Sequence, residues 1–399
     1  MFRFTLLILI IALLPGFVQA QSAVEAARSH RQVHEAQILR DYADFLRIPN
    51  VASDSVNIRR NARHIQQQFA QRGVELDELS VDGAPPIVTG RIEAPGATRT
   101  LGIYVHYDGQ PVDASRWTHG PWTPMLYTAA MHQGGTPRSF PEEGESVDPE
   151  ARIYARGAGD DKAPIAALLA TLDALQERDI ALTSNMVFLF DGEEERGSPH
   201  LDQYLRQYQD RFDGVDLWLF CDGPVHQSRQ PQIVFGVRGV TGMEVTVYGA
   251  NRPLHSGHYG NWAPVPGQML ANLLASMKST DGEVLIDGFY DTVEPLTEAE
   301  RAALDELPRV DEQLKDELRL ARTEGGGERL EERLLLPSLT VRGLASGNVG
   351  DKARNIIPST ATAALGVRLV KGNDPDQMLD LVEQHIPCAG LPHRSRDAV

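Results

Sequence analysis

Short apolar runs alternate with helix-length amphipathic segments through the first 230 residues. The runs at 101–105, 187–190 and 217–221 are typical of buried strands, and shorter strands are predicted at 74–81 and 87–92. Helical patterning covers 24–46, 58–72, 163–177 and 200–208. Strand, helix and strand in repetition predict an α/β fold, with a mostly parallel sheet flanked by helices.

The pattern changes beyond about residue 231. Strands are predicted at 240–248, 339–344 and 360–370, and helices at 266–277 and 375–386. The segment 297–333 is charged and helix-prone. This half of the chain predicts a second, smaller α+β domain. The predicted organisation is a targeting segment at 1–20, an α/β domain at 21–232 and an α+β domain at 233–399.

Three of the predicted strands end in polar residues that could bind a metal. The strand at 101–105 runs into His106 and Asp108, the central strand runs into three acids at 193–195, and the strand at 217–221 runs into Asp222. Parallel strands place their carboxyl ends at one edge of a sheet, where ligands collect. Adjacent carboxylates repel one another, so a cation is expected among them. A solvated acidic turn is the ordinary alternative for any one of these stretches.

A further pair of acids, Asp160 and Asp161, follows a Gly-rich turn and precedes a helix. An acidic N-cap is the usual role of an Asp at such a place. One carboxylate could cap the helix while the other faces a metal. Adjacent Glu194 and Glu195 offer a similar division, with one acid as ligand and the other as general base.

Composition and net charge argue against some classes of binding partner. The 399 residues are 42% hydrophobic and 23% charged, which is ordinary for a globular protein. The formal net charge of −17 argues against nucleic-acid and anionic-membrane partners. Two cysteines are too few for a disulfide scaffold.

The N-terminus has the pattern of a cleavable signal peptide. Arg3 supplies the basic region, residues 6–14 an apolar region, and the small residues before 21 a cleavage site after Ala20. The apolar run is short for a membrane span. The expected location is therefore periplasmic or secreted, with no membrane attachment after cleavage.

Three motifs resemble those of the co-catalytic zinc exopeptidases, a family that includes carnosinase-type dipeptidases, carboxypeptidase G and succinyl-diaminopimelate desuccinylase. The run HYDGQP at 106–111 resembles H-x-D-x-x-P, RGAGDDK at 156–162 resembles R-G-x-x-D-D-K, and GEEERGS at 192–198 resembles G-x-E-E-x-G-S. The order and spacing of these motifs match those of the family from about residue 30 to 386. The Asp-Asp-Lys run and LHSG at 254–257 are most similar to the carnosinase-like dipeptidases.

The resemblance implies a role for each matched residue. His106 and Asp222 would bind one zinc ion, Asp160 would bridge two, and Glu195 would bind the second. Other divalent metals such as Mn or Co are possible. Asp108 would orient His106, and Glu194 would be the general base that activates a bridging water. Glu193 falls in the variable position of the motif.

The α+β domain resembles the family's lid and dimerisation domain. The resemblance implies a homodimer in which His255 reaches the partner's active site and stabilises an oxyanion. A turn His with a local hydrogen bond is the alternative. Asn355 and Arg368 match substrate-holding positions, and a guanidinium suits a peptide carboxylate.

The expected activity is hydrolysis of dipeptides or short peptides, with removal of an acyl group from N-acyl amino acids as the alternative. One departure from the family concerns the chain end. In relatives a returning segment completes the catalytic domain and supplies a last His ligand, whereas this sequence stops at Val399. His385 and His393 fall too early to replace that ligand, and a truncated product with little activity is a further expectation.

Overall fold

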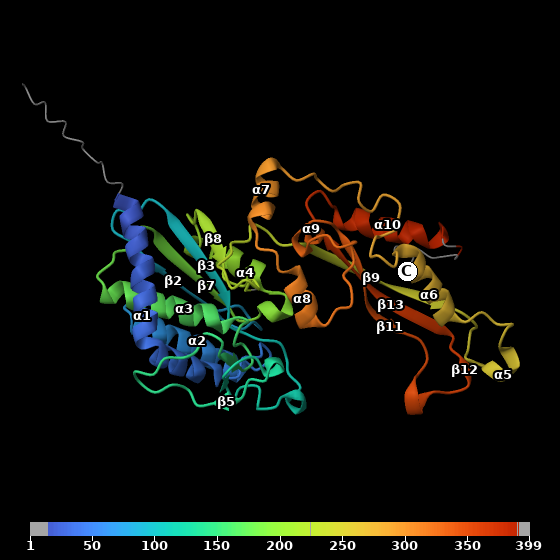
Figure 1. The fold of residues 1–399 in the computed structure, drawn as a ribbon, viewed down its shortest axis with the longest axis horizontal. Helices are drawn as coiled ribbons and strands as arrows, with labels where there is room; N and C mark the ends of the chain where they lie inside the picture. Colours follow the sequence, from blue (N-terminus) through green and yellow to red (C-terminus); the bar gives the residue numbers. More distant parts are fainter. Residues whose placement is uncertain (1–14, 224, 389, 391–399) are drawn as a thin grey trace, which may run out of the picture. The chain divides into compact units, whose positions relative to one another are not determined.

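The computed structural model describes residues 15–223, 225–388 and 390, and the chain divides into two compact units (Figure 1). The first is Met1–Pro224 and the second is Val225–Val399. Each unit contains its own sheet and its own cluster of buried apolar side chains. The two units are therefore described separately.

A five-stranded mixed sheet forms the centre of the first unit. Its spatial order is β1 (Leu76–Leu79), β2 (Ile87–Ile92), β7 (Asn185–Asp191), β3 (Thr100–His106) and β8 (Leu217–Phe220). The strands β7, β3 and β8 are parallel, while β2 and β1 add antiparallel pairs at one edge. This sheet with helices on both faces confirms the predicted α/β class.

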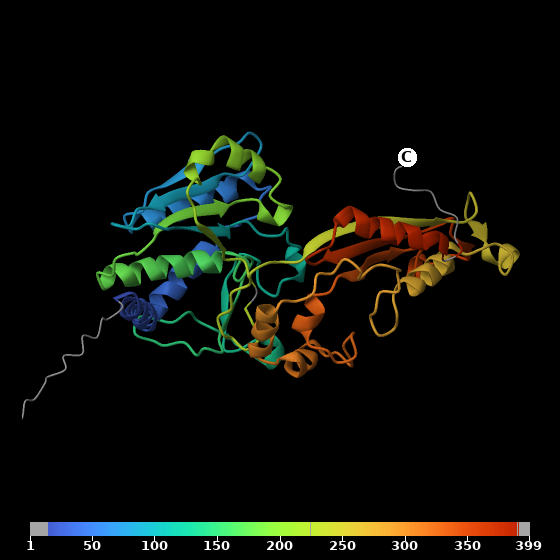
Figure 2. The ribbon, with the colours of Figure 1, turned by 90° about the horizontal axis from the view of Figure 1, so that it is seen from above.

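Successive side chains of the central strands enter different cores, because strand residues alternate between the faces of a sheet. Phe188 and Phe190 pack on one face with apolar residues of α2 and α3. Leu189 and Tyr104 pack on the other face against Tyr204 of α4. Figure 2 shows α3 and α4 on opposite sides of the strands. Both faces of the strands that carry the candidate ligands are thus buried.

Four α-helices cover this sheet: α1 (Pro15–Leu46), α2 (Ser55–Ala70), α3 (Lys162–Glu177) and α4 (Leu201–Gln207). Helix α2 begins at Ser55 because the Asp54 side chain accepts a hydrogen bond from the Asn57 amide at 3.1 Å. Helix α1 packs along α3. No helix in the described part of the chain combines the length and the hydropathy needed to cross a bilayer.

The segment between β3 and α3 (Lys162–Glu177), in which the sequence pattern predicts no helix or strand, contains several short elements. A three-stranded antiparallel sheet joins β5 (Pro137–Arg138), β4 (Met125–Tyr127) and β6 (Arg152–Tyr154). Single 3₁₀ turns lie at Ala114–Arg116 and Met131–Gln133. Strands of two or three residues are too short to show a period of two, so the sequence pattern gives no signal for them.

The second unit is built on a three-stranded antiparallel sheet, in the order β11 (Ser338–Ala345), β13 (Thr360–Leu369) and β9 (Gly239–Tyr248). Alternate residues of β13 from Ala361 to Leu369 are buried. They pack with apolar residues of α6 (Pro266–Met277) and α10 (Pro375–Cys388). The other elements of this unit are β10 (Leu254–His255), α5 (Ser256–Tyr259), α7 (Glu298–Glu306), α8 (Asp311–Leu318), α9 (Leu330–Leu334) and β12 (Ile356–Ile357).

The packing of β8 against β3 can be tested at Gly102. It pairs directly with Trp218, and a Cβ at this position would lie 2.4 Å from Cε3 of the indole. We expect Gly102→Ala to displace Trp218 and lower the free energy of unfolding by about 1–3 kcal/mol. Denaturant unfolding would measure the change. Gly343→Ala is the matched control, because its Cβ would make an ordinary 3.8 Å contact with Ala364; equal losses in both variants would contradict the close packing.

Candidate metal centre

The register of the parallel strands brings His106 and Asp222 to the same point. Tyr104 of β3 pairs with Phe220 of β8, so the residues two positions later, His106 and Asp222, continue side by side. His106 also pairs with Asp191, the last residue of β7. The turn that carries the three acids begins there. The carboxyl edge of the sheet therefore collects these polar groups, as the strand pattern predicts.

The imidazole of His106 is fully buried and surrounded by carboxylates. Its Nε2 lies 2.8 Å from Asp160 Oδ1 and 3.9 Å from both Asp222 Oδ1 and Glu194 Oε2. Suitable ligand atoms of His106, Asp160 and Asp222 all lie within 4.8 Å of one another. These three residues, with Glu194 beside them, form a cluster of potential metal ligands at the carboxyl edge of the sheet.

Asp108 joins the end of β3 to the turn after β7. It is fully buried, and its two oxygens accept hydrogen bonds from the amides of Glu194 at 3.0 Å and Glu195 at 3.2 Å. Its Oδ1 also lies 3.4 Å from His106 Nδ1. That contact is electrostatic rather than a well-formed hydrogen bond, since Nδ1 has no hydrogen-bond partner among the described residues. Asp108 thus sits behind His106 and fixes the acidic turn.

The two acids before α3 point in different directions. Asp160 is exposed and reaches His106, and the peptide bond that joins it to Asp161 is cis. Asp161 is 1% exposed, and its Oδ2 approaches the His106 amide at 3.4 Å. Asp161 occupies the N-cap position of α3, but its side chain makes no capping hydrogen bond. Asp161 therefore does not stabilise the start of α3 through a capping hydrogen bond.

The three acids after β7 have three different environments. Glu193 is 2% exposed, and its Oε1 accepts a hydrogen bond from the His200 amide at 3.0 Å, with His200 Nδ1 at 2.9 Å. Glu194, in the 3₁₀ turn η3 (Glu194–Arg196), is the acid that faces His106. Glu195 accepts hydrogen bonds from Gln110, at 3.3 Å from the amide and 2.7 Å from Nε2, and is not within the His106 cluster.

The pKa shifts at this edge all indicate a place for positive charge. Burial opposes protonation of His106, but the carboxylates of Asp108, Asp161 and Asp222 raise its pKa to about 10. Burial, together with the negative charge of Asp222, raises the pKa of Asp161 to about 8. Burial also raises the pKa of Glu194. Acids whose ionised forms are disfavoured, beside an imidazole whose protonated form is favoured, make an environment that attracts a cation.

Lys162 does not supply that positive charge, although it directly follows Asp161. Its side chain is fully buried, and Nζ donates hydrogen bonds at 3.0 Å to the carbonyl oxygens of Phe45 and Ile48. Nζ also lies 4.4 Å from the centre of the Phe45 ring. Burial holds the pKa of Lys162 well below its usual value. No ion pair joins the acids of the cluster to a Lys or Arg side chain in the described part of the chain.

The predicted residues of the second half of the chain lie in the second unit. His255 is exposed, its ring lies 4.6 Å from that of His258, and its Nδ1 accepts a hydrogen bond from the Gly257 amide at 3.1 Å. Pairing of β10 with β12 places it beside Asn355, whose carbonyl accepts a hydrogen bond from the Ser256 amide. Arg368 is exposed on β13, opposite Val240 and Ser338.

The structure describes one of the two histidines near the end of the sequence. His385 lies on α10, and its Nε2 is 2.9 Å from Ser276 Oγ within the second unit. His393 lies outside the described residues.

Comparisons with known proteins identify relatives that hydrolyse peptides. The sequence profile of Peptidase family M20/M25/M40 matches residues 102–325. A Cys-Gly metallodipeptidase of Schizosaccharomyces pombe is 26% identical over 356 residues, which cover 85% of this chain and 70% of the relative. A Beta-Ala-His dipeptidase of Homo sapiens is 25% identical, over 84% of this chain and 66% of the relative.

Comparison with solved structures points to the same family. An M20 family metallo-carboxypeptidase from Sulfolobus solfataricus superposes with a TM-score of 0.69 at 28% identity, covering 90% of this chain and 76% of that chain.

The comparisons correct the prediction of a periplasmic or secreted protein. The yeast Cys-Gly dipeptidases that the chain resembles are cytosolic. The apolar residues 6–14, on which the prediction depended, lie outside the described residues. An apolar N-terminal run was therefore given more weight than the relatives support.

The two hydrogen bonds that Asp108 accepts predict that its carboxylate stabilises the turn after β7. An Asn at this position keeps one acceptor and places an NH₂ group against a buried backbone N–H. We expect Asp108→Asn to lower the free energy of unfolding by about 1–3 kcal/mol because one amide of the acidic turn loses its partner. Urea unfolding would measure the change. The matched control is Asp82→Asn, an exposed position in the same unit; a neutral result at Asp108 would show that the turn does not depend on it.

Proposed function

The chain belongs to peptidase family M20/M25/M40, and we propose that it cleaves dipeptides or short peptides with Glu194 as the general base. Membership of this family confirms the predicted resemblance, and the dipeptidase relatives confirm the metallopeptidase class. The observation that carries the proposal is the convergence of His106, Asp160 and Asp222 with Glu194 beside them. A base adjacent to a cation site is the arrangement that amide hydrolysis by water requires.

The donor set fits a transition-metal ion. One imidazole nitrogen and two carboxylate oxygens are ligands that zinc accepts. The orphaned Nδ1 of His106 beside Asp108 is the usual arrangement of a metal-bound histidine, in which the far nitrogen faces a carboxylate. His106, Asp160 and Asp222 would hold the ion, which when bound lowers the pKa of water and polarises a carbonyl oxygen.

Glu194 is placed to move the proton. Its Oε2 lies 3.9 Å from His106 Nε2, so it faces the same point as the proposed ligands. Burial raises its pKa, and a more basic carboxylate is a better acceptor near neutral pH. Glu194 would take a proton from the attacking water and pass it to the nitrogen of the leaving amine. Asp108 would hold both the His106 ring and the backbone of Glu194 in place.

A second ion is proposed at Asp160 and Glu195. Asp160 is 61% exposed on its side chain, so it has room to contact two ions. Glu195 would have to exchange its hydrogen bonds with Gln110 for the second ion. We propose two zinc ions, with Mn or Co as substitutes.

The second unit would contribute to substrate binding and to dimer formation. Exposed His255 and Asn355 lie together, where the β10–β12 pair ends, and suit a hydrogen-bonding role toward a peptide carbonyl. Exposed Arg368 would bind a terminal carboxylate in a bidentate manner. We propose a homodimer through this unit, in which His255 serves the active site of the partner.

The substrate class is tested with purified, zinc-loaded protein and a panel that contains Cys-Gly, β-Ala-His and several N-acyl amino acids. We expect cleavage of free dipeptides and little release from the N-acyl compounds. Amine release measured by chromatography would give the rates. Faster turnover of N-acyl amino acids would replace the peptidase proposal by an amidohydrolase one, and no turnover of any compound would reject both.

Glu194 is tested by Glu194→Gln, which removes the proton acceptor and leaves the proposed ligands intact. We expect kcat to fall by about 10²–10⁴-fold with the zinc content unchanged. Steady-state kinetics and elemental analysis would measure the two quantities.

Two variants serve as controls for this test. Glu143→Gln changes an exposed acid in the long connecting segment and should be silent. Glu193→Gln should weaken the contact with His200 and act on stability rather than on proton transfer. A larger loss of kcat at Glu193 than at Glu194 in well-folded protein would mean that the base is assigned one residue too late.

A further inference from the structure

A second cluster of metal-binding side chains lies between helices α1 and α3 of the first unit. His30 and His34 are one turn apart on α1, and Glu177 is the last residue of α3. His30 Nδ1 lies 2.6 Å from Glu177 Oε2, and His34 Nε2 lies 3.7 Å from the same oxygen. Suitable ligand atoms of all three residues fall within 4.8 Å of one another.

The cluster is separate from the candidate catalytic centre. Helix α3 has 16 residues and is therefore about 24 Å long. Asp160 and Asp161 precede its first residue, whereas Glu177 is its last. No side chain of the peptidase mechanism takes part in the second cluster, so that mechanism does not account for it.

We propose that His30, His34 and Glu177 bind a divalent transition-metal ion, zinc in the first place, that fastens α1 to α3. Two imidazoles and one carboxylate suit Zn²⁺, Cu²⁺, Ni²⁺ and Co²⁺ and do not suit Mg²⁺ or Ca²⁺, which require oxygen ligands. Residues at i and i+4 share one face of a helix, which is how two histidines of one helix reach a single ion.

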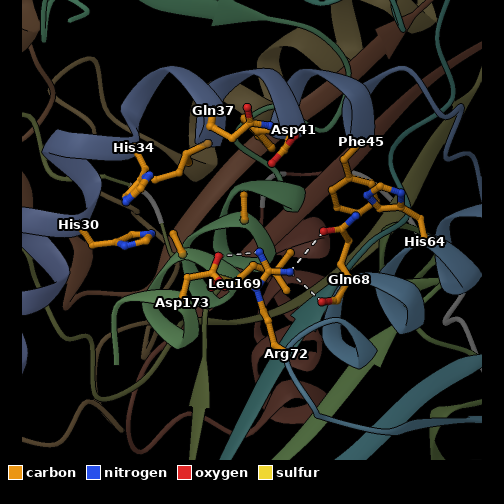
Figure 3. A pocket seen from close by; sticks show the side chains of 14 residues that line it. His30, His34, Gln37, Asp41, Phe45, His64, Gln68, Arg72, Leu169 and Asp173 are labelled. Atoms are coloured by element: carbon orange, nitrogen blue, oxygen red, sulfur yellow. Dashed lines mark hydrogen bonds and ion pairs between the residues drawn. The ribbon is translucent and has the colours of Figure 1, made fainter. Parts of the chain in front are cut away.

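The distances fit a tetrahedral ion after small side-chain movements. Zinc bonds of about 2.0–2.1 Å place neighbouring ligand atoms roughly 3.3 Å apart. The two contacts to Glu177 Oε2, at 2.6 and 3.7 Å, lie on either side of that value. The rings of His30 and His34 are 4.3 Å apart at their centres and inclined by 34°. Figure 3 shows both rings on α1, side by side.

The exposure of the three side chains leaves access for an ion. The His30 side chain is 10% exposed, and those of His34 and Glu177 are each 45% exposed. Arg178 is the one cation near Glu177 in the described chain, and it approaches the other oxygen, Oε1, at 4.0 Å.

A shallow pocket of about 140 Å³ begins at the two histidines and runs between α1, α2 and α3 (Figure 3). A three-ligand zinc site needs a fourth ligand, and the pocket leaves room beside the two histidines for a water molecule to supply it. An ordinary His30–Glu177 ion pair is the alternative explanation. It gives no role to His34, whose nitrogen also faces the carboxylate.

The test separates this site from the catalytic one. Asp160→Asn and Asp222→Asn together remove two exposed candidate ligands of the catalytic centre, and this double variant is the background. We expect the metal-free background protein to bind one Zn²⁺ in a competition titration with a chromophoric chelator. Adding His34→Ala, or separately Glu177→Gln, should weaken that binding by at least about tenfold. Adding His132→Ala, an exposed histidine elsewhere in the unit, should change nothing.

Two further measurements complete the test. In the 399-residue chain without the background substitutions, zinc should raise the Tm, and His34→Ala should remove part of that increase without changing dipeptide turnover. Co²⁺ bound to the background should give the intense visible absorption of a tetrahedral ion, and Glu177→Gln should abolish it. Unchanged zinc affinity in both His34→Ala and Glu177→Gln would overturn the proposal. Loss of dipeptide turnover alone would concern only the proposed peptidase function.

Discussion

The buried carboxylate of Asp108 is the interaction on which the rest of the metal centre depends. It belongs to the end of β3, yet both of its oxygens are bonded to backbone amides of the turn that follows β7. The same group lies behind His106. One side chain thus fixes the position of a candidate ligand and of the candidate base. A buried carboxylate with two amide donors is costly to replace, because each amide would lose its partner at a buried position.

Around Asp108, the protein brings together more carboxylates than cationic side chains. His106, Asp160, Asp161, Asp222 and Glu194 approach one another from three strands and the start of a helix. Such a group is stabilised by a cation or by bound protons, and burial together with the charge of Asp222 raises the pKa of Asp161. The sheet makes this possible, because strands held by apolar contacts on both faces can keep repelling groups together.

The sequence was sufficient to predict the sheet and part of the site. Apolar runs mark where β3 and β8 end, and parallel strands end at one edge, so the meeting of His106 with Asp222 follows from the pattern. The roles of neighbouring acids were harder to predict. Asp161 was considered as a helix cap, but it is buried beside His106 and caps nothing. Glu193 and Glu195 differ only in how the turn directs them, toward His200 or Gln110. Directions within a turn depend on tertiary contacts that no periodicity encodes.

The burial of Lys162 has a consequence for which ions the protein selects. The lysine nearest to the acids in sequence is bound instead to the carbonyls of Phe45 and Ile48, with its amine beneath the Phe45 ring. Among the described residues no Lys or Arg side chain pairs with the acids of this cluster, so a bound cation would be attracted there, and simple attraction does not distinguish one divalent ion from another. Within the described cluster His106 supplies the one nitrogen ligand, and nitrogen ligands favour zinc, cobalt or nickel over magnesium and calcium. For the proposed centre we therefore expect similar transition metals to replace one another more readily than magnesium or calcium replaces any of them.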